Sequence, residues 1–338
     1  MGGLRTEAEI LATDTPSAFE AAVHRAAAAL RAGEVVALPT ETVYGLAANA
    51  LDPAAVSRIF EVKGRPAQNP LIVHVADLAM AKRCVVRWTK LADKLASAFW
   101  PGPLTLVLDR APCIPEVVTA GGPTVGLRWP SHRVIQAVIR ECGFPLAAPS
   151  ANLSNRISPT AADHVRRQLG NKIGLIVDGG PSQIGIESTV LDLTSPNPLV
   201  LRPGMIHEAA LLAVTGTLGM PGGEAEVVLR SPGQFKKHYA PKARLVVHAW
   251  RDAAQLETLC SAYGVPRSQV HILAYSGIPA GFDRVSVIPR EPGAFARALY
   301  AELHRCDEAG AELIIVEALP PGSEWRALAD RLNRAAAT

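Results

Sequence analysis

Apolar residues in the first part of the chain recur in short blocks whose spacing changes from helical to strand-like. The Ala-rich stretch 17–32 places apolar residues three and four positions apart, which predicts an amphipathic helix that ends before Gly33. The apolar run 34–39 follows it and is typical of a short buried strand. The polar segment 40–46 after this run is typical of a turn.

The same criteria predict further elements as far as residue 202. Asp52 and Pro53 open a helix that ends at Lys63, because Asp is a preferred N-cap and Pro a preferred first helical residue. Ser131 is expected to cap another helix. Helices are predicted over 52–63, 88–99, 131–142 and 159–169, and strands over 71–75, 104–109, 124–128, 173–178, 188–193 and 199–202, with an apolar run at 144–148. Since these elements form no regular βαβ repeat, we expect a twisted mixed sheet with helices packed on it.

From residue 244 onward, strands and helices alternate regularly. Strands are predicted over 245–247, 270–274 and 313–317, and helices over 252–263, 292–309 and 323–337. This alternation predicts a small open α/β domain of Rossmann-like type with a parallel sheet. The pattern therefore divides the chain into an N-terminal domain 1–206, a linker or lid 207–243, and a C-terminal domain 244–338.

Composition agrees with a two-domain globular protein. The 338 residues exceed the size of one ordinary core, and 49% of them are apolar while 19% are charged. No apolar run approaches the roughly 18 to 20 residues of a membrane span, and the N-terminus lacks the apolar core of a signal peptide. We therefore expect a cytoplasmic protein. The net charge of +3 is too small to indicate a nucleic-acid coat protein.

Two cations at the end of the helix 52–63 are candidates for phosphate binding. Lys63 and Arg65 flank Gly64, and Pro66 stiffens the turn that follows. An ammonium and a planar guanidinium suit a triphosphate, but cations at a helix C-terminus also complement the helix dipole. Both interpretations remain open from the residues alone.

A polar group follows the apolar run 144–148. Ser150, Asn152 and Ser158 offer donors for phosphates or a base edge, although Ser and Asn are also ordinary turn residues. The sequence contains neither GxxxxGK[ST] nor GxGxxG, so the two common single-loop nucleotide motifs are absent.

Arg128 ends an apolar strand and is expected to be buried there. A buried arginine needs an anionic partner, which is either a ligand carboxylate or an internal Asp or Glu. Thr42 in the preceding turn offers a hydroxyl, and His74 lies on a predicted strand, where histidine is most often a satisfied core residue. No GxSxG, HExxH or paired CxxC motif occurs, so we expect neither a nucleophilic triad nor a protein-held metal.

Seven segments, taken in order, resemble the YrdC-like family, and most closely its two-domain form, the L-threonylcarbamoyladenylate synthases. They are Pro-Thr-Glu-Thr-Val-Tyr-Gly-Leu at 39–46, the segment 63–74, Gly-Leu-Arg-Trp-Pro at 126–130, Ala-Pro-Ser-Ala-Asn at 148–152, and the segments 158–160, 187–190 and 201–204. The linker sequence at 238–241 and the α/β domain after it also resemble the long form. The resemblance thus covers nearly the whole chain.

The resemblance implies a reaction, its substrates and its partners. L-threonine, bicarbonate or CO2, and ATP would give threonylcarbamoyl-AMP and pyrophosphate, with Mg²⁺ bound to the phosphates rather than to the protein. A separate threonylcarbamoyl transferase complex would then modify tRNA, and weak contact of this chain with tRNA is possible. An RNA-binding YrdC-like module and another carbamoyl-transfer enzyme are the alternatives. The absence of paired CxxC and the modest charge oppose them.

The resemblance also assigns roles to individual residues. Lys63 and Arg65 would act on the triphosphate. The remaining nucleotide contacts would come from Asn69, Thr124, Ser150, Asn152, Ser158, Arg202 and Tyr239, the last as a lid. The threonine contacts would come from Thr42, His74, Arg128, Ser188 and the backbone of Ala148. One departure is Asn155 where family members often carry Gly, and Asn tolerates the left-handed backbone that such a turn requires.

Overall fold

The computed structural model describes residues 7–219 and 239–337, which form two compact units. The first unit contains residues 7–154 and 158–219, and the second contains 155–157 and 239–337. Much of the predicted linker, residues 220–238, lies outside the described residues. Each unit has its own sheet and is described separately.

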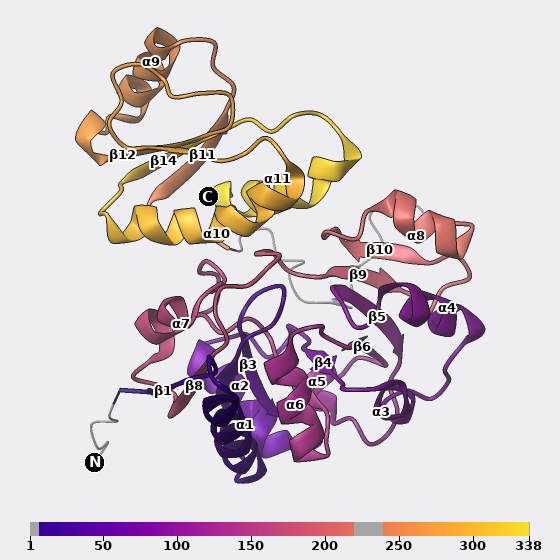
Figure 1. Cartoon of the computed structure of the whole chain (residues 1–338). Coiled ribbons are helices and arrows are strands. Elements are labelled where there is room, and N and C mark those ends of the chain that lie inside the picture. The colour runs from indigo at the N-terminus through magenta and orange to yellow at the C-terminus, as the bar shows by residue number, and fades with distance from the viewer. Residues whose placement is uncertain (1–6, 220–238, 338) are drawn as a thin grey trace. The chain divides into compact units, whose positions relative to one another are not determined.

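The first unit is built on one ten-stranded mixed sheet (Figure 1). Its strands are β1 (Glu9–Ala12), β2 (Val36–Leu38), β3 (Gly45–Asn49), β4 (Ile72–His74), β5 (Leu104–Asp109), β6 (Thr124–Arg128), β7 (Leu146–Ala147), β8 (Leu175–Asp178), β9 (Thr189–Asp192) and β10 (Leu199–Arg202). Their order across the sheet is β1-β8-β2-β3-β7-β4-β6-β5-β9-β10. Parallel pairs such as β4–β6 and antiparallel pairs such as β5–β6 occur together, so the prediction of a mixed sheet is confirmed.

Eight helices of the first unit are described. They are α1 (Pro16–Arg31), α2 (Pro53–Lys63), α3 (Leu78–Arg83), α4 (Lys90–Phe99), α5 (Glu116–Thr119), α6 (Arg133–Cys142), α7 (Ala162–Leu169) and α8 (Glu208–Thr215). Helices α1 and α6 pack against each other, and α4 packs against α8 (Figure 1). The apolar faces of these helices and the sheet share one core, in which Leu30, Leu46 and Ile135 are fully buried.

Helix starts follow the capping rules, with one correction. The Asp52 carboxylate accepts a hydrogen bond from the Ala54 N–H, as its position before Pro53 predicts. The prediction that Ser131 caps the next helix is wrong. His132 is the N-cap of α6, and its Nδ1 accepts from the Val134 N–H. An imidazole acceptor can thus replace the hydroxyl that pattern rules favour.

Several short helices and strands were not predicted, because their hydrophobic periodicity is too weak to identify them. The segment 40–46, expected to be a turn throughout, already contains the start of β3. The short elements β1, α3, α5 and β13 were also absent from the prediction, and α8 lies inside the segment predicted as a linker. Each of these spans eight residues or fewer, so few apolar positions are available to show a period.

The second unit has a four-stranded parallel sheet in the order β11-β14-β12-β13. Its strands are β11 (Arg244–His248), β12 (Val270–Ala274), β13 (Val285–Val287) and β14 (Leu313–Glu317), and its helices are α9 (Ala253–Tyr263), α10 (Pro292–Glu308) and α11 (Arg326–Ala336). Helix α9 lies on one face of the sheet, and α10 and α11 lie on the other (Figure 1). The predicted open α/β architecture is confirmed.

Replacing Leu30 by Ala tests the shared core of the first unit. Leu30 ends the buried face of α1 and has no exposed surface. We expect Leu30→Ala to lower the free energy of unfolding of this unit by about 2–5 kcal/mol, measured by urea denaturation. Val86→Ala, at a side chain that is 69% exposed, should change it by less than about 0.5 kcal/mol. Equal effects of the two substitutions would contradict this assignment of the core.

Candidate active site

Neighbouring strands place several predicted site residues side by side. Strands β4 and β6 run parallel, and their last residues, His74 and Arg128, are partners in the register. Strand β7 pairs with β4 on its other side, and the Ala148 N–H, just past β7, donates to the Ile72 carbonyl. The predicted threonine contacts His74, Arg128 and Ala148 thus lie on three adjacent strands or directly after them.

The turn before β3 is organised around the Thr40 hydroxyl. Thr40 Oγ1 donates to the Val43 carbonyl at 2.6 Å and accepts from the backbone N–H groups of Thr42 and Val43 at 3.2 Å. The Thr42 hydroxyl lies 2.9 Å from the same oxygen. Thr40 and Thr42 are both buried, so this turn is an interior part of the site and not a surface loop.

Arg128 and Glu41 form a buried ion pair. Arg128 Nη2 lies 2.9 Å from Glu41 Oε1, and the two residues are only 4% and 2% exposed. The same Nη2 donates to Thr40 Oγ1 at 3.3 Å. Arg128 Nε donates to no described residue, so the guanidinium keeps a free donor within the described part of the chain. The sequence left open a ligand carboxylate or an internal acid as partner, and the structure contains the internal acid.

His74 is buried next to Arg128 and stays neutral. Loss of hydration on burial, together with the positive charge of Arg128, holds the pKa of His74 well below its usual range. Its Nδ1 has no hydrogen-bond partner among the described residues. Neutral imidazole beside an arginine leaves one ring nitrogen available to a ligand hydroxyl or N–H.

The ammonium group of Lys63 holds the loop that follows β7. Lys63 Nζ donates to the carbonyls of Ser150 and Asn152 at 2.6 and 2.5 Å and to Asn152 Oδ1 at 3.1 Å. The Ser150 hydroxyl in turn donates to Asn152 Oδ1 at 2.6 Å. Burial and the charge of Arg65 lower the pKa of Lys63 well below its usual range. Two residues predicted separately, Lys63 and Asn152, are therefore in direct contact.

Arg65 has a similar role in the turn after α2. Its Nε and Nη2 donate to the carbonyls of Asn69 and Pro70 at 3.3 and 3.0 Å. Gly64 makes the sharp exit from the helix possible, because its φ of 59° lies in the left-handed region. The segment 65–70 is thus held as a preformed loop beside Lys63.

Further buried hydrogen bonds involve the predicted residues Ser158, Ser188 and Arg202. The Ser158 hydroxyl donates to Glu187 Oε1 at 2.6 Å. Arg202 Nε and Nη2 donate to the carbonyl and hydroxyl of Ser188, both at 3.1 Å, and that hydroxyl lies 2.8 Å from Thr105 Oγ1. The end of β10 and the start of β9 are therefore held together by side chains that the sequence assigned to two different substrates.

Three further predicted positions complete the set. Thr124 begins β6 and is half-buried. Asn155 has a φ of 65°, which confirms the expected left-handed backbone. In the second unit the Tyr239 ring packs against Tyr300, with centroids 5.9 Å apart, and lies under the Arg331 guanidinium.

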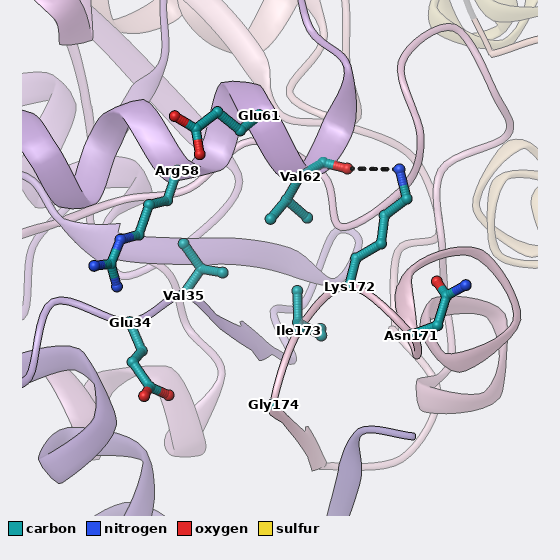
Figure 2. Close-up of a pocket in the computed structure, with 9 residues that line it drawn as sticks. All are labelled: Glu34, Val35, Arg58, Glu61, Val62, Asn171, Lys172, Ile173 and Gly174. Carbon is teal, nitrogen blue, oxygen red and sulfur yellow. Dashed lines mark hydrogen bonds between the residues drawn. The ribbon is translucent and has the colours of Figure 1, made fainter. Parts of the chain in front are cut away.

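A cavity of the first unit is lined by none of these side chains (Figure 2). Its volume is ≈ 730 Å³, and Glu34, Arg58, Glu61 and Lys172 project around it. Lys172 Nζ donates across it to the Val62 carbonyl at 3.4 Å. None of its lining residues was predicted to bind a substrate.

The sequence analysis gave no role to Glu41, Glu187 or Thr105, although all three are buried among the site residues. Glu41 lies in the segment 39–46, between apolar runs that become β2 and β3. A carboxylate between two buried strands was the signal that could have identified it. Glu187 follows the same rule, because it precedes the buried strand β9.

Within residues 7–219 and 239–337, no group of three His, Cys, Asp or Glu side chains is arranged to hold a metal ion. No helix in this part of the chain is long and apolar enough to span a bilayer.

Comparisons with known proteins cover both units. Residues 28–204 match the Sua5–YciO–YrdC family model, described as telomere recombination, and residues 204–337 match the model described as threonylcarbamoyl-AMP synthase, C-terminal domain. The chain is similar to the threonylcarbamoyl-AMP synthase of Bacillus subtilis, with 41% identity over 96% of this chain and 95% of that protein. It is also similar to that of Pyrococcus abyssi, with 40% identity over 92% of both chains. A crystal structure of P. abyssi Sua5 complexed with L-threonine matches with a TM-score of 0.89 and 38% identity over 98% of both chains.

Replacing His74 tests the neutral imidazole through the pH dependence of stability. Below a pH of about 6.5 the unfolded chain protonates this histidine while the native chain does not, so stability falls with falling pH by up to about 1.4 kcal/mol per pH unit. Because His74→Gln removes this one protonation, we expect the unfolding free energy of the variant to fall less steeply with falling pH than that of wild type. Urea unfolding of the first unit between pH 7.5 and 5 measures the two slopes. Parallel slopes for wild type and His74→Gln would contradict the lowered pKa.

Proposed function

The chain belongs to the threonylcarbamoyl-AMP synthase family, and on this premise we propose that it joins L-threonine, bicarbonate or CO2, and ATP into threonylcarbamoyl-AMP with release of pyrophosphate. The match extends over at least 92% of the chain in two relatives that carry this name. Both units therefore correspond to units of the relatives. The complex of the P. abyssi protein with L-threonine supports the amino acid as one substrate.

The observation that carries the proposal is the incomplete hydrogen bonding of Arg128. A guanidinium that is 4% exposed and keeps Nε free within the described residues has a donor available for an anion. A carboxylate at this point would also lie beside the neutral His74. We propose that the threonine carboxylate binds Arg128, and that its side-chain hydroxyl is within reach of His74 and Ser188. Thr42 and the backbone of Ala148 would complete this pocket.

We propose that ATP binds along the loops that Lys63 and Arg65 hold in place. The side chains of Lys63 and Arg65 donate to the backbone of 150–152 and 69–70. The positions of both side chains and the geometry of both loops are therefore fixed before substrate arrives. Preformed loops of this kind lower the ordering cost of binding a triphosphate. The contacts would come from Lys63, Arg65, Asn69, Thr124, Ser150, Asn152, Ser158 and Arg202.

The proposed reaction depends on positioning of the three reactants and on stabilisation of the phosphate charge more than on acid–base catalysis. Threonine's neutral amine attacks CO2 and loses a proton to water, which gives a carbamate. A carbamate oxygen then attacks the α-phosphate in line while pyrophosphate leaves. Little covalent work is required of the protein in phosphoryl-type transfers. The cations Lys63 and Arg65 would offset the charge that develops on the phosphates.

Mg²⁺ would enter with the nucleotide. This ion keeps several waters and is usually bound by one or two carboxylates together with substrate phosphates. Of the two glutamates buried among the site residues, Glu41 is paired in charge with Arg128, and Glu187 accepts a hydrogen bond from Ser158. That donor set fits an ion held mainly by phosphate oxygens and water. When bound, it would neutralise phosphate charge.

The product is a reactive mixed anhydride and needs an acceptor. We propose that a separate threonylcarbamoyl transferase complex consumes it in tRNA modification, with at most weak contact between this chain and tRNA. The net charge of +3 supports a minor electrostatic contribution to any such contact.

Pyrophosphate release tests the proposed reaction directly. We expect the purified full chain to release pyrophosphate from ATP only when L-threonine, bicarbonate and Mg²⁺ are all present, because the carbamate is the nucleophile. Coupled phosphate detection measures the rate, and omission of each component serves as its own control. An undiminished rate without threonine would refute the synthase assignment.

Truncation of Arg128 tests the carboxylate site. Arg128→Ala should weaken threonine binding by tenfold or more and leave the affinity for a non-hydrolysable ATP analogue within about twofold, measured by calorimetry. The matched control is Arg110→Ala. Arg110 directly follows the neighbouring strand β5, is half-buried, and pairs with the exposed Glu116. Equal loss of both ligands in Arg128→Ala would reject the assigned role.

A further inference from the structure

Glu41 is a buried acid whose hydrogen bonding is incomplete in the structure. Neither carboxylate oxygen accepts a hydrogen bond from a described residue, although the side chain is only 2% exposed. Oε1 lies 2.9 Å from Arg128 Nη2, but this ion-pair contact lacks the alignment of a hydrogen bond, and the same Nη2 donates to Thr40 Oγ1. A buried carboxylate normally accepts several hydrogen bonds, so Glu41 retains acceptor capacity that a ligand donor can fill.

The Arg128–Glu41 pair carries no net charge before any ligand arrives. Arg128 contributes the positive charge and Glu41 the negative one. The two histidines in the surroundings are neutral, because burial lowers the pKa of both His74 and His132. A ligand with a carboxylate alone would leave this buried region with an uncompensated negative charge, whereas a zwitterion would leave it neutral.

The ion pair therefore keeps unused hydrogen-bonding groups on both of its members, a donor on the cation and acceptors on the anion. Arg128 Nε is an unused donor, and the Glu41 carboxylate has unused acceptors. An α-amino acid carries a carboxylate and an ammonium on the same carbon atom. Its two charges match the two sides of this pair in sign and number.

We propose that Glu41 binds the α-ammonium group of the amino-acid substrate while Arg128 binds its α-carboxylate, so that the ion pair selects zwitterionic α-amino acids. This inference rests on the proposed function and adds the group that recognises the amine. It predicts rejection of 2-hydroxy acids and N-acylated amino acids, which lack the ammonium. Arg128 has a second role in this arrangement, since it compensates Glu41 when the substrate is absent.

A merely structural role of Glu41 has different consequences. If Glu41 only positioned Arg128, its removal would weaken every ligand that carries a carboxylate by the same factor. If Glu41 binds the ammonium, its removal weakens only ligands that carry an amine. Comparison of two ligands in one variant therefore separates the two roles.

The experiment compares L-threonine with the 2,3-dihydroxybutanoate of matching configuration, in which a hydroxyl replaces the amine. Calorimetry on the full-length wild type should give at least tenfold tighter binding of threonine. In Glu41→Gln, threonine affinity should fall at least tenfold, while the affinity for the dihydroxy acid should stay constant or rise. Glu34→Gln, which changes an exposed glutamate two residues before β2, should match wild type for both ligands.

Two results would overturn the inference. One is an equal loss of both ligands in Glu41→Gln, which would make Glu41 a positioning residue for Arg128. The other is unchanged threonine binding in that variant. Binding of a non-hydrolysable ATP analogue shows whether the variant is folded. If it is not, the wild-type comparison decides alone, because affinities within twofold of each other would exclude recognition of the ammonium.

Failure of this inference is distinguishable from failure of the proposed function. Threonine-dependent pyrophosphate release by the wild type tests the function and does not depend on how the amine is held. Release that requires threonine, combined with equal binding of the two acids, would leave the synthase activity standing and reject the role of Glu41 only.

Discussion

The compensation of buried charge organises the first unit. Lys63, Arg65, Arg128 and Arg202 are cations with exposures of 8% or less, and burial of a charge is tolerated only where polar partners replace its hydration. Lys63 and Arg65 find theirs in backbone carbonyls, and Arg202 finds its partners in the carbonyl and hydroxyl of Ser188. These contacts fix the loop after β7, the turn 65–70 before β4, and the end of β10 against the start of β9. The residues that handle charge in the proposed reaction are therefore the ones that hold the site in shape.

Arg128 differs from the other three cations because its partner is itself a charge with incomplete hydrogen bonding. A salt bridge of this kind is a weak source of stability, since desolvation of both ions opposes their attraction. Its retention in a buried position is easier to understand where a ligand completes the hydrogen bonding of both ions. The Arg128–Glu41 pair connects the turn before β3 with the end of β6, so it joins segments that are 87 positions apart in the chain. The proposed amino-acid site exists only where these segments meet.

The overall architecture could largely be predicted from the sequence. Long elements with a clear period, such as α1 and α10, were located to within one or two residues, and the change from a mixed to a parallel sheet followed from the order of strands and helices. The resemblance to the family assigned His74, Arg128 and Ala148 to one site, and in the structure they lie on neighbouring strands or directly after them. Short elements such as β1, β13 and α5 were missed because four residues or fewer cannot establish a period.

The partners of the polar residues were beyond the reach of local patterns. Residue types and spacing indicated that Arg128 would be buried and would need an anion, yet they left open whether that anion was a ligand or an internal acid. Lys63 and Arg65 were likewise identified as cations on a turn, but not as donors to the backbone of 150–152 and 69–70. The sequence by itself determined which charged residue types are present, where the long helices and strands form, and which family the motifs resemble. The tertiary structure alone decided which charge meets which oxygen, because a hydrogen bond depends on distances of about 3 Å between atoms whose residues lie tens of positions apart.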